Sequence, residues 1–207
     1  MYQAYVIDFN DSFTFNILSI LQELNLSCNV ISIEKLEENL SLLESEEKKI
    51  IIWGPGPKHP FEYKEFFPLI SGLRKLKQNY HVGICLGHQI LMILEGFSIK
   101  PAKNIIHGQN IEIQIPDWDA CFDVNSIEKI TKVQRYNSLA VETKKSTHLK
   151  CLSIDQEVMI TAYPNGVSYQ FHPESVGTSF PHLFFYSSIN YLYNESDGRN
   201  TQNFRYL

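Results

Sequence analysis

The sequence has no excess of positive charge. Its 18 lysine and arginine residues are outnumbered by 23 aspartate and glutamate residues, so the formal charge is −5. A nucleic-acid-binding protein is expected to carry a basic face, so this balance argues against that class. No apolar run approaches the roughly 18 residues that a membrane-spanning helix needs. The N-terminal residues also lack a basic segment followed by an apolar core, so we expect a cytoplasmic protein rather than a secreted one.

Cysteine is scarce and shows no paired spacing. The four cysteines lie at positions 28, 85, 121 and 151, and no two of them have the Cys-x-x-Cys spacing. A chain of 207 residues can bury enough apolar surface to fold without a disulfide framework, so we expect reduced thiols. Internal repeats, low-complexity tracts and linkers are also lacking. We therefore expect one domain over residues 1–193, followed by a polar tail over residues 194–207.

Short apolar segments alternate with helical patterns in the first half of the chain. We expect strands at residues 5–8, 28–33, 50–53 and 81–84. Helices are expected at residues 11–24, 34–49, 61–77 and 86–94, the first with Asp11 or Ser12 as its N-cap. This alternation predicts a parallel sheet that is covered by helices on both faces.

The second half of the chain is richer in expected strands. They occupy residues 110–115, 132–136, 149–154, 158–163 and 167–171, with a hairpin turn at Asp155-Gln156 and a last helix at residues 179–193. The predicted fold class is therefore α/β, with three layers. It has a mostly parallel central sheet, helices on both faces and a smaller antiparallel portion in the second half.

The strongest chemical signal is Gly83-Ile84-Cys85-Leu86-Gly87, between an expected strand and an expected helix. It has the G-x-nucleophile-x-G pattern of a nucleophile elbow, with cysteine as the nucleophile. The glycines permit a strained turn, and the helix N-terminus that follows favours the thiolate. The backbone N–H of Leu86 is then available to hold an oxyanion. A buried cysteine in a glycine-rich turn is the alternative interpretation.

A cysteine nucleophile needs a base, and two of the seven histidines are candidates. His172 lies at the end of an expected strand, and Glu174 can accept a hydrogen bond from its ring and fix its tautomer. Cys85, His172 and Glu174 would then be nucleophile, base and orienting acid. His88 lies one helical turn after Cys85, where a packing role is the more common fate. Cys85 and His172 can meet only if their two strands are neighbours.

Two further patterns bear on the site. Cys85-x-x-His88, with His172 and Glu174, has ligand-like spacing for zinc, but the second close-spaced pair of a structural zinc site is lacking, so we expect no metal. Gly54-Pro55-Gly56-Pro57 ends the strand that precedes the Cys85 strand in the chain. A glycine N–H there is a candidate second oxyanion donor, and an ordinary strand-ending turn is the alternative.

Two of these motifs together resemble the class I (triad-type) glutamine amidotransferases. They are Gly83-Ile84-Cys85-Leu86-Gly87-His88-Gln89 and Phe171-His172-Pro173-Glu174-Ser175. Four more segments are similar to the small subunits of anthranilate synthase and aminodeoxychorismate synthase. They are residues 7–16, Pro55-Gly56-Pro57, Arg135-Tyr136-Asn137-Ser138-Leu139 and Ser175-Val176-Gly177-Thr178. The resemblance extends over about residues 4–193, nearly the whole chain.

The resemblance implies that glutamine is hydrolysed to glutamate. The ammonia would pass to a chorismate-binding large subunit, in a heterodimer or heterotetramer. By the same resemblance, Cys85 forms a glutamyl thioester, His172 moves the protons and Glu174 orients His172. The N–H groups of Gly56 and Leu86 would hold the oxyanion.

The resemblance also implies how the substrate is recognised. Gln89 and the backbone of Ser138 and Leu139 would bind the amino-acid end of glutamine. No cofactor is implied in this subunit, whereas Mg²⁺ is expected in the partner synthase subunit. The anthranilate branch and the 4-amino-4-deoxychorismate branch both stay open.

The sequence departs from the family pattern in places around the site. Lys58 stands where the Pro-Gly-Pro-Gly turn has its second glycine, and a register shift of two would make Gly54 rather than Gly56 the oxyanion glycine. The other departures are Gln109 for the lysine of His-Gly-Lys, Asn137 for the histidine of Arg-Tyr-His-Ser-Leu, and Phe9-Asn10 for Asn-Tyr. None of them removes Cys85, His172 or Glu174.

These departures motivate a second hypothesis, a non-catalytic subunit that binds the same partner. A third hypothesis keeps the chemistry and changes the acceptor, as in a glutaminase for another synthetase or a stand-alone γ-glutamyl hydrolase. The Asp11-Ser12-Phe13-Thr14 segment speaks against the third hypothesis.

Overall fold

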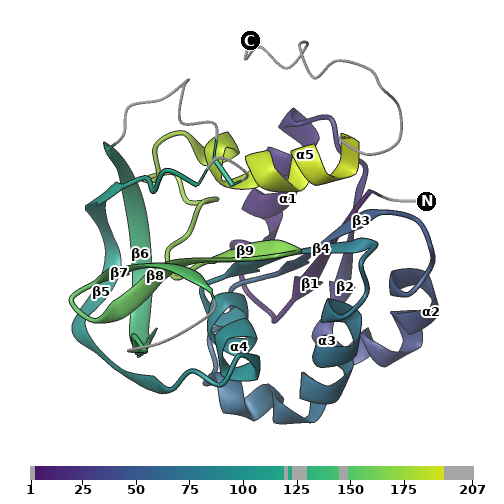
Figure 1. Ribbon diagram of the computed structural model, residues 1–207, viewed down its shortest axis with the longest axis horizontal. Helices are drawn as coiled ribbons and strands as arrows, with labels where there is room; N and C mark the ends of the chain where they lie inside the picture. The colour runs from purple at the N-terminus through teal and green to yellow at the C-terminus, as the bar shows by residue number, and fades with distance from the viewer. Residues whose placement is uncertain (1–2, 119–120, 123–129, 145–148, 194–207) are drawn as a thin grey trace.

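The computed structural model describes residues 3–118, 121–122, 130–144 and 149–193, which form a central sheet between two layers of helices (Figure 1). The sheet has seven strands in the order β2-β1-β3-β4-β9-β8-β7. Their bounds are β1 Ala4–Asp8, β2 Cys28–Ser32, β3 Lys49–Trp53, β4 Asn79–Ile84, β7 Lys150–Ile154, β8 Glu157–Tyr163 and β9 Gly166–Tyr169. Strands β2, β1, β3, β4 and β9 pair in parallel, and β8 is antiparallel to both of its neighbours. The predicted fold class is confirmed.

The middle strands of the sheet are buried on both faces, as is typical of parallel sheets between helices. In β1, Ala4 and Val6 belong to the apolar core on one face, and Tyr5 and Ile7 belong to the core on the other. The first face is covered by α1 Thr14–Glu23 and α5 Tyr186–Tyr193. The second face is covered by α3 Phe67–Arg74 and α4 Leu86–Leu94, with the short α2 Leu40–Leu43 beside them.

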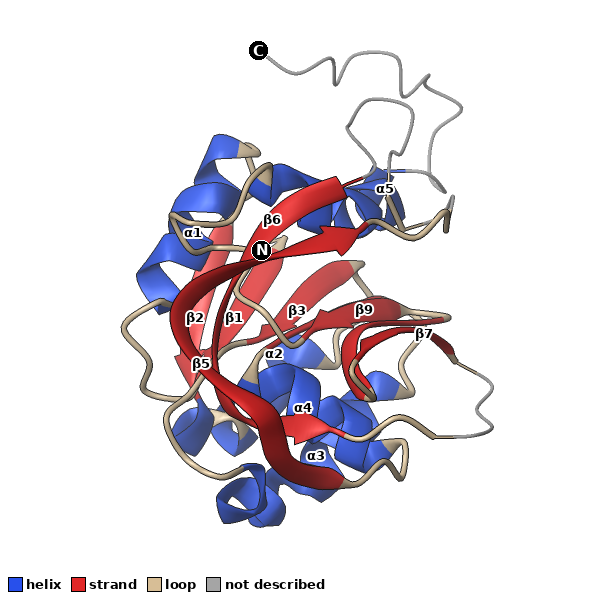
Figure 2. Ribbon diagram, turned by 90° about the vertical axis from the view of Figure 1, so that its left-hand side faces the viewer, coloured by secondary structure: helices blue, strands red, loops and turns tan. Residues whose placement is uncertain are grey.

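A second sheet of two long strands stands at the β7 and β8 side of the central sheet (Figures 1 and 2). It pairs β5 Ile99–Gln114 with β6 Ile130–Val141 in antiparallel fashion. Only residues 110–115 and 132–136 of this pair are predicted from the sequence. The rest of β5 is mostly exposed and contains Pro101 and Gly108, so it lacks the buried apolar run that marks a strand.

The predicted hairpin at Asp155-Gln156 is confirmed. It joins β7 to β8, which pair in antiparallel fashion. Both turn residues have positive φ angles, 52° for Asp155 and 68° for Gln156. This is the conformation of a type I′ turn, whose twist matches that of the strands.

Three of the predicted helices differ from the structure. Residues 34–49 are not one helix, because two 3₁₀ turns and α2 are followed by β3, which begins at Lys49. The Lys49 ammonium group is buried and donates hydrogen bonds to the carbonyls of Ser45 (2.7 Å) and Glu47 (2.5 Å). Residues 61–77 and 179–193 each begin as a 3₁₀ helix, Pro60–Phe66 and Pro181–Phe185, before α3 and α5.

The expected N-cap of the first helix is also wrong. Helix α1 is preceded by Phe13, and no side chain caps it. Asp11 instead stabilises the loop before the helix, where its carboxylate accepts the N–H of Phe13 (2.9 Å). Asp8, at the end of β1, accepts the N–H of Asp11 (3.2 Å) and the hydroxyl of Thr14 (2.7 Å). These bonds fix the loop between β1 and α1 at the carboxyl end of the sheet.

None of the helices in the described ranges has the length and apolar character that crossing a membrane requires. The predicted tail, residues 194–207, lies outside the described residues, so the predicted domain boundary stays a prediction.

Candidate active site

Cys85 lies in a strained turn at the carboxyl end of β4. Its φ angle of 50° with ψ of −99° is unusual for a residue other than glycine, and α4 begins at the next residue. The turn requires glycine at positions 83 and 87, because neighbouring atoms leave no room for a side chain there. A Cβ on Gly87 would lie 2.0 Å from the carbonyl oxygen of Trp53, and one on Gly83 would lie 3.0 Å from the backbone nitrogen of His88. This is the elbow geometry that the sequence pattern predicts.

The strand order brings the predicted base to the cysteine. Strands β4 and β9 are parallel neighbours, with Ile84 opposite Tyr169, and the N–H of Cys85 donates to the carbonyl of Tyr169 (2.8 Å). His172 follows three residues after Tyr169. The condition that the sequence left open, that the two strands are neighbours, is met.

The second sheet holds His172 in place from the other side. The backbone N–H of His172 donates to the carbonyl of Gln134 in β6 (2.9 Å). The hydroxyl of Thr178 donates to the carbonyl of His172 (2.6 Å) and accepts the N–H of Gln134 (3.0 Å). The histidine is therefore tied to both sheets through its backbone.

Glu174 lies against the far side of the imidazole. Its carboxylate is 2.7 Å from Nδ1 of His172, and both side chains are buried. An ionised carboxylate only accepts, so Nδ1 carries a proton and Nε2 is the ring nitrogen left to act on Cys85. Nε2 is buried and makes no hydrogen bond among the described residues, although the charge of Cys85 acts on the ring. Cys85, His172 and Glu174 thus lie in the order of nucleophile, base and orienting acid.

The electrostatics of the site favour a protonated imidazole. Burial by itself lowers the pKa of His172. The charges of Glu174 and Cys85, with the hydrogen bond between Glu174 and the ring, outweigh burial and hold this pKa well above its usual value. A positive imidazole beside a cysteine favours the thiolate, which is the nucleophilic form of the sulfur.

Two aromatic rings pack around His172. The ring centroid of Phe13 lies 5.2 Å from that of the imidazole, and the centroid of Tyr136 lies 5.1 Å from it. Phe13 and Tyr136 also contact each other, with centroids 5.1 Å apart. These rings restrict the rotation of the imidazole and help to exclude water from it.

The turn after β3 lies next to the elbow, and its hydrogen bonds distinguish the two candidate glycines. Gly54 donates its N–H to the carbonyl of Ile7 (3.0 Å) and accepts the N–H of Gly87 (3.1 Å). The N–H of Gly54 is therefore not available to an oxyanion. The N–H groups of Gly56 and Leu86 have no acceptor among the described residues. Gly56 and Leu86 are therefore the donors left for an oxyanion.

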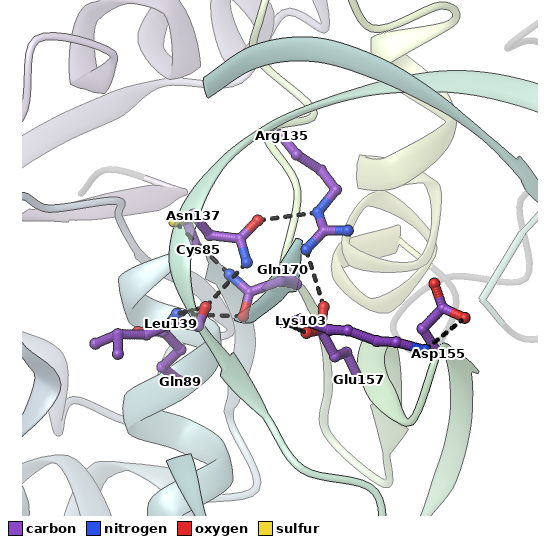
Figure 3. Close-up of polar contacts among 9 residues, drawn as sticks. All are labelled: Cys85, Gln89, Lys103, Arg135, Asn137, Leu139, Asp155, Glu157 and Gln170. Atoms are coloured by element: carbon purple, nitrogen blue, oxygen red, sulfur yellow. Dashed lines mark hydrogen bonds and ion pairs between the residues drawn. The ribbon is translucent and has the colours of Figure 1, made fainter. Parts of the chain in front are cut away.

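Gln89, Asn137 and Leu139 form one hydrogen-bonded group beside Cys85 (Figure 3). The amide nitrogens of Gln89 (3.0 Å) and Asn137 (2.9 Å) both donate to the carbonyl of Leu139. Gln89 donates its second amide hydrogen to the amide oxygen of Gln170 (3.2 Å), so only its own amide oxygen stays free, as an acceptor that suits an ammonium group. Ser138, the third predicted glutamine-binding residue, lies between Asn137 and Leu139 and is exposed.

The departures from the family pattern are accommodated without loss of the site. Lys58 does not have a positive φ angle, and its ammonium group lies 5.9 Å from the centroid of the Tyr63 ring. Asn10 donates to a carboxylate oxygen of Glu34 (3.0 Å). Gln109 is exposed at a bulge of β5.

His88 has the packing role expected of it. It is fully buried, its Nδ1 lies 2.8 Å from the hydroxyl of Ser168 in β9, and burial lowers its pKa to about 3. Within the described ranges, no three His, Cys, Asp or Glu side chains gather as a metal site would require.

Sequence reasoning missed three residues that the structure places at the site. Gln170 donates to the Cys85 sulfur (3.8 Å), and Phe13 packs on His172. Arg135 supports Asn137 through a hydrogen bond of 2.9 Å from Nε to Oδ1. Each lies within or next to one of the sequence motifs, but an amide, a phenyl ring and a guanidinium group carry no signal of a role until their neighbours are known.

Comparisons with known proteins agree with this geometry. Residues 5–190 match the profile of the family Glutamine amidotransferase class-I. The chain is 32% identical over 190 residues to Anthranilate synthase component 2 of Saccharolobus solfataricus, which covers 89% of this chain and 96% of that protein. It is 29% identical over 182 residues to Putative anthranilate synthase component II of Haemophilus influenzae, with coverage of 84% and 89%.

A solved structure is similar in fold. The crystal structure of a putative GMP synthase subunit from Thermoplasma acidophilum matches with a TM-score of 0.75 and 17% identity, over 93% of this chain and 94% of that one. At that identity the match shows the fold alone. The family match extends over nearly all of the described chain, and the chain therefore belongs to the class I glutamine amidotransferases.

Proposed function

We propose that this enzyme hydrolyses glutamine through a thioester on Cys85 and delivers the ammonia to a chorismate-using synthase subunit. The observation that carries the proposal is the alignment of Cys85, His172 and Glu174 at the ends of two neighbouring strands. The names of the relatives from Saccharolobus solfataricus and Haemophilus influenzae support the choice of partner.

The first half of the reaction forms the thioester. The Cys85 thiolate attacks the side-chain carbonyl carbon of glutamine, and the oxyanion accepts the N–H groups of Gly56 and Leu86. The C–N bond then breaks as His172 gives its Nε2 proton to the leaving nitrogen, which departs as ammonia. Glu174 keeps its hydrogen bond to Nδ1 throughout, so the ring stays oriented.

The second half of the reaction releases glutamate. A water molecule gives a proton to Nε2 of His172 and attacks the thioester carbonyl. The C–S bond breaks, and the sulfur leaves as the thiolate beside the protonated imidazole. During both halves, the oxygen of Gln89 would accept from the α-ammonium group, and the backbone of Ser138 and Leu139 would line the same end of the substrate.

These steps use only side chains and backbone of this chain, so we propose that this subunit carries no cofactor, and we expect Mg²⁺ with the partner. A cytoplasmic location is proposed as well, because a free catalytic thiol such as Cys85 persists in a reducing compartment. The proposed product is anthranilate or 4-amino-4-deoxychorismate, and the proposed assembly is a heterodimer or heterotetramer.

The test is ammonia release from glutamine, with chorismate and each candidate large subunit present. We expect wild-type activity in the complex, weak activity of this protein without a partner, and loss of activity in Cys85→Ser. Cys151→Ser is the matched control, since that thiol lies in β7 away from the site. Equal activity of wild type and Cys85→Ser would refute the proposal, and full turnover without any partner would favour a stand-alone hydrolase. The aromatic amine formed identifies the branch.

A further inference from the structure

Gln170 lies directly beside the sulfur of Cys85. It is the first residue after β9, as Cys85 is the first after β4, and the register of Ile84 with Tyr169 sets the two side by side. The amide nitrogen of Gln170 is 3.8 Å from the sulfur (Figure 3), and the residue is fully buried. A buried amide in contact with the reacting atom calls for a chemical explanation.

The neighbours of Gln170 determine which end of its amide faces the sulfur. The amide nitrogen of Gln89 donates one hydrogen to the carbonyl of Leu139 (3.0 Å), which can only accept. It donates the other to the amide oxygen of Gln170 (3.2 Å). The nitrogen of Gln170 must therefore point at Cys85, because a flipped amide would set N–H against N–H and an oxygen against the sulfur.

The support for this arrangement continues behind Gln89. Asn137 donates a second hydrogen bond to the carbonyl of Leu139, and Arg135 donates to Asn137. The backbone N–H of Gln170 donates to the carbonyl of Met159 (2.9 Å). Such a connected polar network holds its members in one orientation.

We propose that Gln170 is a further catalytic residue, whose amide N–H donates to the Cys85 sulfur and stabilises the thiolate, with Gln89 as the residue that orients it. This inference rests on the proposed glutaminase function of Cys85. It adds a neutral donor to the charged groups that act on the sulfur, namely His172 with Glu174 behind it. His88, on α4, is directed toward Ser168 and adds no charge there.

The test measures how readily the thiolate forms, without using turnover. Iodoacetamide labelling of Cys85 is followed by peptide mass spectrometry as a function of pH, in wild type and in Gln170→Met. Methionine has a similar length and no N–H to donate. Because loss of the donor destabilises the thiolate, we expect the labelling midpoint to rise by about half a unit to one unit. An unchanged midpoint in a folded Gln170→Met protein would overturn the inference.

A second variant and a matched control complete the design. Gln89→Met frees the Gln170 amide to rotate, so we expect a rise of the midpoint in the same direction, and this variant carries the test if Gln170→Met does not fold. Asn79→Leu removes a buried amide at the opposite end of β4, where it donates to the carbonyls of Leu43 and Leu73. It should lower the thermal midpoint and leave the labelling midpoint unchanged. An equal rise in all three variants would mean general loosening, and the inference would fail.

The inference about Gln170 and the proposed function of the protein can be refuted independently of each other. A wild-type protein that never releases ammonia with any partner refutes the function, whatever the labelling shows. A wild-type glutaminase whose Cys85 labelling is indifferent to Gln170 keeps the function and loses the inference.

Discussion

Arg135 and Glu157 form a buried ion pair behind the candidate glutamine site. Their Nη2 and Oε2 atoms are 3.1 Å apart, and the side chains are 5% and 3% exposed. The other carboxylate oxygen of Glu157 accepts the backbone N–H of Lys103 (2.5 Å), and Nε of Arg135 donates to Asn137. Asn137, where the family pattern has histidine, thus connects the ion pair to the carbonyl of Leu139, to which its amide nitrogen donates.

The first prediction concerns this pair. Glu157→Gln keeps the shape of the side chain and leaves the guanidinium group of Arg135 buried without its counter-charge. We expect the free energy of unfolding to fall by about 3 kcal/mol. We also expect the KM for glutamine to rise, because Asn137 and Leu139 lose their support. Urea unfolding and glutaminase kinetics in the complex measure the two effects.

The neighbouring surface pair offers a matched control. Lys103 and Asp155 lie 3.7 Å apart and are 64% and 53% exposed. Asp155→Asn makes the same carboxylate-to-amide change, and asparagine tolerates the positive φ angle at this position. We expect it to change stability by less than about 1 kcal/mol. If both variants lose the same stability, the buried pair has no special role.

The second prediction concerns the orienting acid. The carboxylate of Glu174 raises the pKa of His172, while burial lowers it. Glu174→Gln therefore lowers this pKa, which NMR titration of the labelled imidazole can follow. The glutaminase kcat should fall by about 100-fold, because the ring loses both its charge partner and its fixed tautomer.

An exposed pair of the same type is the control for Glu174. Nε2 of His182 lies 2.9 Å from the carboxylate of Glu23 on the surface. Glu23→Gln should leave the titration of His172 and the glutaminase rate unchanged. A normal rate and an unshifted His172 titration in Glu174→Gln would contradict the role given to Glu174.

A helix or strand can be predicted from the sequence when the pattern that determines it lies within one segment of the chain. The sequence predicts helix α4 with its observed bounds, because the elbow glycines and a regular apolar pattern lie together in one segment. It also predicts strands β1 and β3, because strands buried on both faces are short apolar runs. It does not predict the length of β5, because the pairing with β6, not the exposed side chains of β5, makes this segment a strand.

The same distinction applies to the site. Cys85 and the pair of His172 and Glu174 carry chemical signals in their own motifs. That they meet depends on β9 being the neighbour of β4, which is a property of the whole sheet. Gln170 could not be assigned from the sequence, because its role follows only from the hydrogen bond that Gln89 makes to it.

The third prediction concerns acid stability. Burial lowers the pKa of His88 to about 3 in the folded chain, against about 6.5 when it is unfolded. Above pH 6.5 both states are neutral and the full stability is present. Below it only the unfolded state binds the proton, so stability is lost as the pH falls from about 6.5 towards 3.

Urea unfolding at pH 7 and pH 5 tests this. His88 should account for a loss of about 2 kcal/mol between the two pH values, because each pKa unit corresponds to about 1.4 kcal/mol. In His88→Asn the loss should be smaller by that amount, whereas the exposed His107→Asn should keep the wild-type difference. Equal pH dependence in His88→Asn and wild type would show that His88 is not kept neutral by burial.

The fourth prediction concerns Gly56, in the turn after β3, whose N–H is a candidate oxyanion donor. A Cβ on Gly56 would lie 2.4 Å from Cδ2 of Leu86 and 2.8 Å from Cβ of Phe9. The end of the Leu86 side chain can move, but the Phe9 Cβ is fixed to its backbone, so the turn must shift. Because this moves one oxyanion donor, we expect Gly56→Ala to lower the glutaminase kcat by about 100-fold with little change in KM.

A second glycine in a helix shows what the same substitution does elsewhere. A Cβ on Gly72, in α3, meets nothing within 4 Å. Gly72→Ala should stabilise the fold by about 0.4–1 kcal/mol, since it reduces the conformational freedom of the unfolded chain, and leave kcat unchanged. If Gly56→Ala folds and keeps its kcat, the turn after β3 does not supply the oxyanion donor, and Leu86 must hold the developing charge with another group.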